Sequence, residues 1–149
     1  MEKIRVSRGI EIEVNENGDS IILNTNDIDF MFKLNDVTME IEKIVKEGAA
    51  KEKALSLKKP TKEIGNLTDL DYEYRKLYQK YFGKIRSAMD KFLGEGACKK
   101  IFGETNSWNM WDEFLDAITP ILQKTGVMEK DVNAAIAEKY GADDEDTLK

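Results

Sequence analysis

Two long stretches of the chain carry apolar residues at mixed spacings of three and four. The first runs from Phe30 to Ile44 and the second from Leu70 to Phe92. Such spacing gathers the apolar side chains on one face of an α-helix, and that face must be buried against other elements. We therefore expect two long amphipathic helices. Their stripes are Phe30, Leu34, Val37, Ile41 and Ile44, and Leu70, Tyr74, Leu77, Tyr81, Ile85, Ala88 and Phe92.

The segment between these helices is rich in lysine. Gly48 should weaken the first helix, because glycine is a poor helix former. We interpret Lys51–Glu63, which contains Pro60, as a frayed helix end followed by a linker. Thr68 and Asp71 have the spacing of a capping box, so the second helix should begin near Thr68. Two long helices with a polar linker predict an antiparallel helical hairpin.

Residues 4–23 have the pattern of a β-hairpin. Apolar and charged residues alternate from Ile4 to Val14, which is the period of a half-buried strand. Asn17–Gly18 is suited to the positive φ values of a tight turn, and Ser20–Leu23 returns as the second strand. The segment Asn15–Asp19 superficially resembles a calcium loop. No acidic ligand stands at the twelfth EF-hand position, which favours the turn.

Glycines mark the ends of the later helices. Gly94 and Gly96 should end the second long helix, and Ala97–Phe102 should form a short helix stopped by Gly103. Asn106 or Ser107 then caps a helix that begins near Trp108. Pro120 either kinks this helix or opens a new one.

The expected fold is mostly α, with an N-terminal β-hairpin followed by a bundle of long amphipathic helices. A last helix should cover residues 129–140, after Gly126. We expect the β-hairpin over residues 1–25, the helical domain over residues 26–141 and a flexible acidic tail over residues 142–149.

The chain contains no histidine and a single cysteine. The missing histidine excludes Ser-His-Asp and Cys-His nucleophiles as well as histidine zinc sites. Cys98 therefore fits a small buried hydrophobe better than a reactive thiol. The acidic cluster at Asp69, Asp71 and Glu73 fits a helix start, where negative charge meets the helix dipole. We expect no catalytic residue, no cofactor and no metal site.

Charge and hydropathy limit the partners. A net charge of -6 argues against a general nucleic-acid binder, which needs a basic face. Lys51–Lys62 with the tyrosine-rich helix leaves open a small nucleic-acid-binding regulator as an alternative. No window approaches the roughly 20 apolar residues of a membrane span, and no signal-peptide core is present. One cysteine fits a reducing compartment, so we expect a soluble cytoplasmic protein.

The most distinctive segment is Phe92–Gly103, with the sequence FLGEGACKKIFG. Together with Asn109–Phe114 and with the pattern Leu115-x-x-Ile118-Thr119-Pro120-Ile121, it resembles small tail-region proteins of long-tailed phages and prophages of Gram-positive bacteria. Those proteins are similar to tail assembly chaperones, which are typically encoded between the tail tube protein and the tape measure protein. The resemblance covers residues 28–124 in general pattern and residues 92–121 in wording.

The resemblance implies a helical, non-enzymatic protein that often self-associates. It would coat the long, hydrophobic tape measure protein until tail tube subunits displace it. The family offers no catalytic residue to carry over, and the N-terminal hairpin is not a feature associated with it. An alternative from a structural class is a minor tail or connector protein that stays in the virion.

A chaperone for a long helical client needs apolar anchors on helix faces. Methionine adapts its shape to varied partners, and tryptophan buries a large apolar area. The simpler interpretation is that the methionines fill the core. The candidate partner-binding residues are Met31, Met39, Met89, Trp108, Met110 and Trp111.

Overall fold

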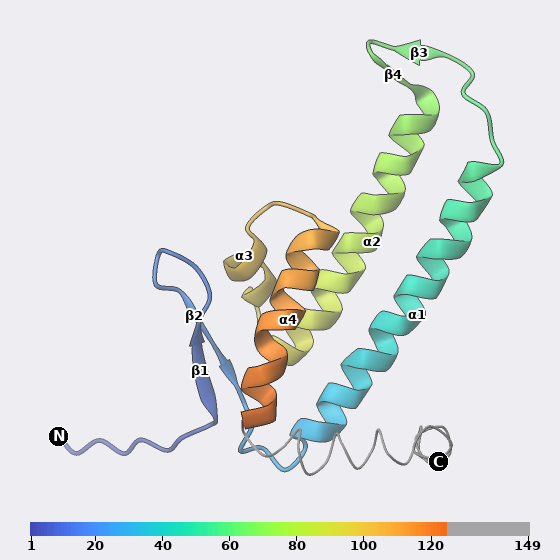
Figure 1. The fold of residues 1–149 in the computed structure, drawn as a ribbon. Helices are drawn as coiled ribbons and strands as arrows, with labels where there is room; N and C mark the ends of the chain where they lie inside the picture. Colours follow the sequence, from blue (N-terminus) through green and yellow to red (C-terminus); the bar gives the residue numbers. More distant parts are fainter. Residues whose placement is uncertain (125–149) are drawn as a thin grey trace, which may run out of the picture. The chain divides into compact units, whose positions relative to one another are not determined.

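The computed structural model describes residues 1–124 (Figure 1). The fold is mostly helical, and an N-terminal β-hairpin precedes the helices, as expected. Gly126, the helix expected at residues 129–140 and the acidic tail at 142–149 lie outside the described residues. None of the helices before residue 125 combines the length and the hydropathy that a membrane span requires.

The chain forms two compact units whose segments interleave in the sequence. Within the described residues, the first unit contains residues 1–11, 22–32 and 107–124. The second contains residues 12–21 and 33–106. Packing defines these units, whereas the domain limits expected at residues 25 and 141 follow the type of element and stay predictions.

The hairpin consists of β1 (Ile10–Glu13) and β2 (Ser20–Leu23). The second strand has the expected bounds, but the prediction that the first begins at Ile4 is wrong. The chain before β1 is held differently, because the backbone N–H of Asn26 donates to the carbonyl of Arg8 over 3.1 Å. Gly9 follows with a φ of +153°, so the regular strand starts only at Ile10.

The connection between β1 and β2 is wider than the two-residue turn expected at Asn17–Gly18. Of these two residues only Gly18 has a positive φ, at +83°. The Oδ1 atom of Asn15 accepts hydrogen bonds from the backbone N–H groups of Asn17 and Asp19, at 2.9 and 3.2 Å. An asparagine side chain that mimics a backbone turn therefore shapes this loop. The N–H of Val14 closes it by donating to the carbonyl of Asp19 over 2.9 Å.

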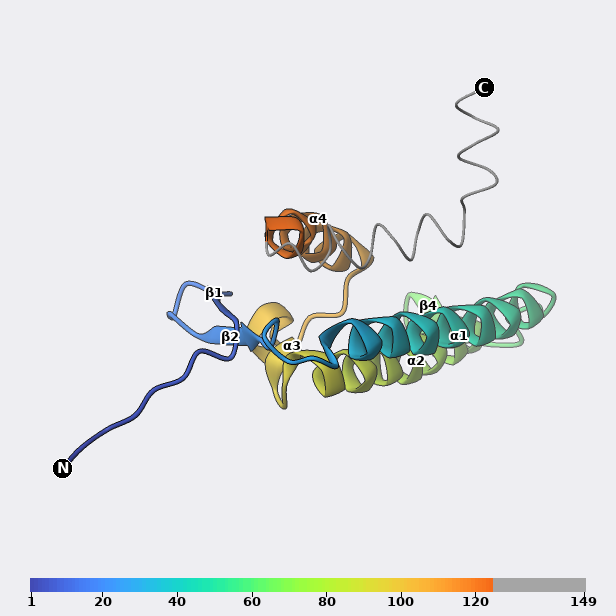
Figure 2. The ribbon, with the colours of Figure 1, turned by 90° about the horizontal axis from the view of Figure 1, so that it is seen from below.

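The two long helices are α1 (Phe30–Ser56) and α2 (Asp69–Leu93), and they lie side by side (Figures 1 and 2). Two ion pairs join them, Lys91 to Glu40 at 3.3 Å and Lys84 to Glu47 at 3.8 Å. The partners are seven residues apart on each helix and run in opposite directions along the chain. The predicted antiparallel helical hairpin is thus confirmed.

Helix α1 continues past Gly48 to Ser56, so regular helix extends into the lysine-rich segment in which a frayed helix end was expected. A Cβ atom at Gly48 would overlap the ring of Tyr81 on α2. The hydroxyl of the same tyrosine donates to the carbonyl of Val45 over 3.0 Å. Glycine here lets an aromatic ring lie directly on the backbone of α1.

A short β-hairpin joins α1 to α2 where the sequence was expected to form only a linker. Strand β3 (Glu63–Ile64) pairs antiparallel with β4 (Leu67–Thr68). Gly65 has a φ of +63° and Asn66 does not have a positive φ, the pattern of a type II′ turn. The signal was present in the sequence, because a Gly-Asn pair is typical of two-residue hairpin turns.

The remaining helices have nearly the expected bounds. Thr68 and Asp71 form the predicted capping box at the start of α2. Helix α3 (Ala97–Phe102) ends at Gly103, as expected. Helix α4 (Trp108–Lys124) is capped by Ser107 and not by Asn106, because the hydroxyl of Ser107 accepts from the N–H of Met110. Pro120 lies inside α4 and opens no new helix.

Burial in the second unit is concentrated at one end of the helical hairpin. Between residues 49 and 81 no side chain is buried. The buried apolar side chains of this unit are Ile21, Val37, Ile44, Phe82, Ile85, Ala88, Met89, Leu93, Ala97, Cys98 and Phe102.

Candidate interaction surfaces

Helix α4 has a broad apolar face that is only partly covered. Trp111, Ile118 and Leu122 are buried. Trp108 and Leu115 belong to the same series of three- and four-residue spacings, yet they remain 46% and 48% exposed. These two residues are seven positions apart, so they lie along one line of the helix. The partly exposed line formed by Trp108 and Leu115 is called the α4 surface.

The ring of Trp111 stabilises this helix face from the buried side. It meets the ring of Phe114 edge-on, with centroids 6.4 Å apart and an angle of 90° between the planes. Edge-to-face contact is a favourable arrangement of two aromatic rings. Both rings belong to α4 and lie one helical turn apart, so the contact is local to this helix.

The six residues expected to bind a partner differ in exposure. Met89 and Trp111 are buried, at 7% and 6% exposure, while Met31 and Met110 are half-buried. Met39 and Trp108 are exposed and accessible to a partner. Met31, Trp108, Met110 and Trp111 belong to the first unit, and Met39 and Met89 belong to the second. Leu115, which was not among the six candidates, stands one heptad after Trp108.

Met39 projects from α1 with 60% of its surface exposed. The amide of Asn35, one helical turn earlier, donates to its sulfur over 3.5 Å. This contact favours one orientation of a side chain that is otherwise flexible.

Arg86 holds the loop that follows α3. Its guanidinium donates to the carbonyls of Gly103 and Thr105 and to the side chain of Asn106, at 2.8, 2.8 and 2.9 Å. It also lies 5.9 Å from the centre of the Phe102 ring, a cation–π distance. One charged side chain therefore satisfies three acceptors of the loop, using the planar fork that only arginine provides.

Cys98 is a buried residue in a structural role. It is 1% exposed, and the carboxylate of Asp90 accepts its backbone N–H over 2.9 Å. Burial, with Asp90 nearby, raises the pKa of the Cys98 thiol to about 12. The thiol therefore stays protonated near neutral pH, and the interpretation of Cys98 as a small buried hydrophobe is confirmed.

The lysine-rich segment surrounds a polar anchor at the start of α2. The carboxylate of Asp69 accepts hydrogen bonds from the N–H groups of Thr61 and Lys62 and from the hydroxyl of Thr61. These bonds, led by the one from the Thr61 hydroxyl, lower the pKa of Asp69 to about 2. The Nζ atom of Lys58 lies 3.9 Å from the Oε2 atom of Glu73, an exposed ion pair nearby. The acidic cluster thus organises the end of the helical hairpin, as expected for a helix start.

Tyrosines line the same end of α2. The rings of Tyr74 and Tyr78 stack with centroids 6.1 Å apart. Partial burial raises the pKa of Tyr78 and of Tyr81. The half-buried rings and the contact of Tyr81 with Gly48 fit packing between the helices better than open platforms for bases.

Metal binding finds no support in the described residues. Between residues 1 and 124, no three acidic or cysteine side chains are grouped so that they could hold a metal ion.

A family match covers most of the chain. The family described as "Family of unknown function (DUF6673)" matches residues 17–147. The chain belongs to this family. No curated protein and no solved structure matches the chain.

The DUF6673 match begins inside the loop between β1 and β2. It includes α1, α2, α3 and α4, and with them all six candidate partner-binding residues. Strand β1 and the segment before it precede the match.

Proposed function

We propose that this member of the DUF6673 family is a non-enzymatic tail assembly chaperone of a long-tailed phage or prophage. It would bind the tape measure protein in the bacterial cytoplasm until tail tube subunits replace it. The proposal starts from the resemblance of residues 92–121 to such proteins. These residues form the end of α2, all of α3 and most of α4.

The observation that carries the proposal is the α4 surface. Trp108 and Leu115 stand one heptad apart with nearly half of each side chain exposed. A long helical client presents apolar residues at the same spacings of three and four, so the side chains of two such helices interlock. A large aromatic side chain such as Trp108 typically contributes a large share of the binding energy.

Charges around the α4 surface support a chaperone role. Asp112, Glu113 and Asp116 are exposed on the same helix. Acidic side chains beside an apolar line keep the free protein in solution while the line stays available. Cys98, with its pKa raised to about 12, supplies no nucleophile near neutral pH, in keeping with a role that involves no catalysis.

Co-expression with the tape measure protein encoded nearby tests the proposal. The wild-type chain should increase the soluble fraction of the tape measure protein and co-purify with it. The double variant Trp108→Ser with Leu115→Ser should lose both effects while it keeps its helical circular dichroism spectrum. A matched control is Leu57→Ser with Ile64→Ser, which removes two exposed apolar residues of the second unit, 81% and 39% exposed, and should behave like wild type.

Two outcomes would reject the proposal. In the first, the wild-type chain leaves the tape measure protein insoluble; in the second, the α4 variant binds it as well as wild type does. Mass spectrometry of purified particles then separates the chaperone from a minor tail or connector protein. An assembly chaperone is absent from mature particles, whereas a connector protein remains in them.

A further inference from the structure

The segment Met1–Val6 has the sequence of a strand but forms none in the monomer. Ile4 and Val6 alternate with Lys3 and Arg5, yet their side chains are 92% and 81% exposed. Alternation of this kind predicts a strand with one covered face. No element between residues 1 and 124 covers that face.

The sheet that this segment precedes is small. Among residues 1–124 it contains only β1 and β2. A two-stranded sheet is marginally stable in water, and a third strand adds both backbone hydrogen bonds and covered apolar area. Ile10 and Ile12 are half-buried on one face of β1, and Glu11 and Glu13 are exposed on the other. An added strand must match this alternation.

The segment Lys3–Val6 matches β1 when it is aligned antiparallel to it. Val6 then stands opposite Ile10 and Ile4 opposite Ile12. In the same register the basic residues meet acidic ones, Arg5 opposite Glu11 and Lys3 opposite Glu13. Opposite charges and apolar pairs directly across two strands stabilise their pairing. A shift by one residue would place charged residues opposite apolar ones.

The backbone of β1 supports this register. The N–H of Val14, just after β1, donates to the carbonyl of Asp19, just before β2. Because backbone groups alternate along a strand, the even-numbered residues of β1 turn theirs toward β2. Ile10 and Ile12 would then meet Val6 and Ile4 as non-hydrogen-bonded pairs, in which side chains approach most closely. Apolar contact is therefore greatest where the apolar residues lie.

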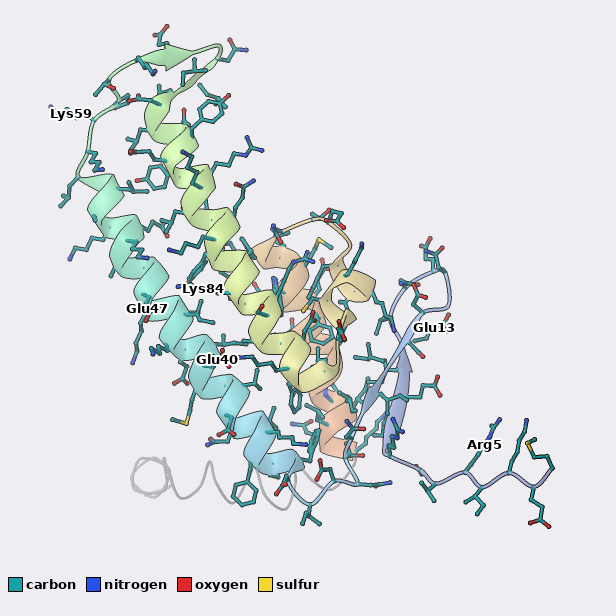
Figure 3. All side chains as sticks on the ribbon, turned by 180° about the vertical axis from the view of Figure 1, so that it is seen from behind. Arg5, Glu13, Glu40, Glu47, Lys59 and Lys84 are labelled. Carbon is teal, nitrogen blue, oxygen red and sulfur yellow. The ribbon has the colours of Figure 1, made fainter. Side chains whose placement is uncertain are left out.

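Within one copy, the backbone bonds around Asn26 direct the segment away from β1. Its side-chain amide donates to the carbonyl of Ser7 over 2.9 Å, and its backbone N–H donates to the carbonyl of Arg8. The N-terminal residues that precede Ser7 run away from β1 instead of folding back along it (Figure 1). Figure 3 shows Arg5 on this segment and Glu13 on the strand.

We propose that Lys3–Val6 of one copy adds as an antiparallel strand to β1 of a second copy, and that the second copy does the same in return. The result is a two-fold symmetric dimer with Ser7–Gly9 near its axis, because the paired positions are symmetric about Arg8. Reciprocal exchange closes the assembly at two copies. A parallel alignment also places apolar residues opposite apolar ones. It is not reciprocal, however, so it would join copies head to tail into open-ended assemblies. The inference is independent of the tape measure proposal.

Charge reversal tests the exchange with the full chain. The variant Lys3→Glu with Arg5→Glu makes the N-terminal segment acidic like β1. The variant Glu11→Lys with Glu13→Lys makes β1 basic like the N-terminal segment. Each variant alone should dissociate roughly tenfold to a hundredfold more readily than wild type, because four attractive pairs per dimer become repulsive. An equimolar mixture of the two variants should form the dimer again, since each acidic half then meets a basic one.

The measurement is sedimentation velocity over a wide range of protein concentrations. A matched control is Lys58→Glu with Lys59→Glu, which reverses two exposed charges on the loop after α1 and should leave the dimer intact. Circular dichroism verifies that each variant is folded. The proposal would be overturned if the wild-type chain stayed monomeric, or if neither charge reversal changed the dissociation of the dimer. Failure of the mixture to reassociate, or growth beyond two copies, would also contradict it.

Discussion

The two halves of the α1–α2 hairpin are held together by different forces. One half contains buried apolar side chains from Val37 to Ile44 on α1 and from Phe82 to Leu93 on α2. The other half, residues 49–81, has no buried side chain and relies on polar contacts. Asp69 there accepts hydrogen bonds from Thr61 and Lys62. We call these the apolar half and the polar half.

Because of this difference, the two halves should respond to different perturbations. Burial of apolar surface depends on side-chain volume, so truncation should damage the apolar half. Exposed ion pairs and charged hydrogen bonds contribute little individually and depend on salt and pH. Chemical conditions should therefore act mainly on the polar half.

The largest effect is expected from truncation in the apolar half. Phe82 is 4% exposed, so Phe82→Ala should reduce the free energy of unfolding by about 3–5 kcal/mol. Leu77 is half-buried in the polar half, and Leu77→Ala should cost only about 1 kcal/mol. Urea denaturation monitored by circular dichroism measures both. Equal losses would mean that the polar half has an apolar core of its own.

Removal of the Arg86 side chain should follow in size. Arg86→Ala leaves the carbonyls of Gly103 and Thr105 without their charged donor, and we expect a loss of about 2–3 kcal/mol. Arg86→Lys should recover only part, because an ammonium group lacks the planar fork. Arg75→Ala on the same helix is the control, since Arg75 is exposed and its loss should change stability by no more than about 0.5 kcal/mol. Urea midpoints rank the variants. If Arg86→Ala lost as little stability as the control, Arg86 would not be what holds the loop after α3.

The spacing of apolar residues was sufficient to predict most helices. The start of α2 and the bounds of α3 followed from Thr68, Gly94, Gly96 and Gly103, because caps and glycines act locally. The effect of Gly48 did not follow, because the ring that requires it belongs to Tyr81, far along the chain. Local signals predict element ends, but they do not reveal which distant side chain lies against them.

The candidate surface was only partly predictable for a similar reason. Periodicity placed Trp108 and Trp111 on the apolar side of one helix, and both are there. It could not tell that Trp111 is 6% exposed and Trp108 46%, since coverage depends on the elements packed around the helix. The N-terminal segment shows the same limit. Its alternation from Ile4 to Val14 predicted a strand, but a strand needs a neighbour, and Ile4 has none in the described residues.

Gly48 lies at the border of the two halves and offers a matched pair with Gly83. Gly48→Ala should destabilise the protein by about 1–3 kcal/mol, because the new methyl group overlaps the ring of Tyr81. Gly83→Ala meets nothing within 4 Å, so it should stabilise α2 by about 0.5–1 kcal/mol. Thermal unfolding distinguishes the two signs. If Gly48→Ala also stabilised the protein, the close packing of Tyr81 on α1 would be refuted.

The smallest effect concerns pH and the polar half. The pKa of Asp69 is lowered from 3.8 to about 2 by its hydrogen bonds, so the folded protein favours the carboxylate more than the unfolded chain does. A group with a lowered pKa stabilises the fold fully above its unfolded value, and the stabilisation is lost as the pH falls toward its folded value. The contribution of Asp69 should therefore decrease as the pH falls from about 4 and be largely lost near pH 2.

Asp69→Asn tests this expectation, because the amide keeps the shape of the side chain and removes its titration. The difference in urea midpoint between wild type and Asp69→Asn should be constant above pH 4 and should shrink as the pH falls to 2. Asp36→Asn, on the exposed side of α1, controls for the loss of one negative charge and should preserve the wild-type profile. A difference that stays constant down to pH 2 would mean that Asp69 holds Thr61 and Lys62 without relying on its charge. The polar half would then be as insensitive to acid as the apolar half.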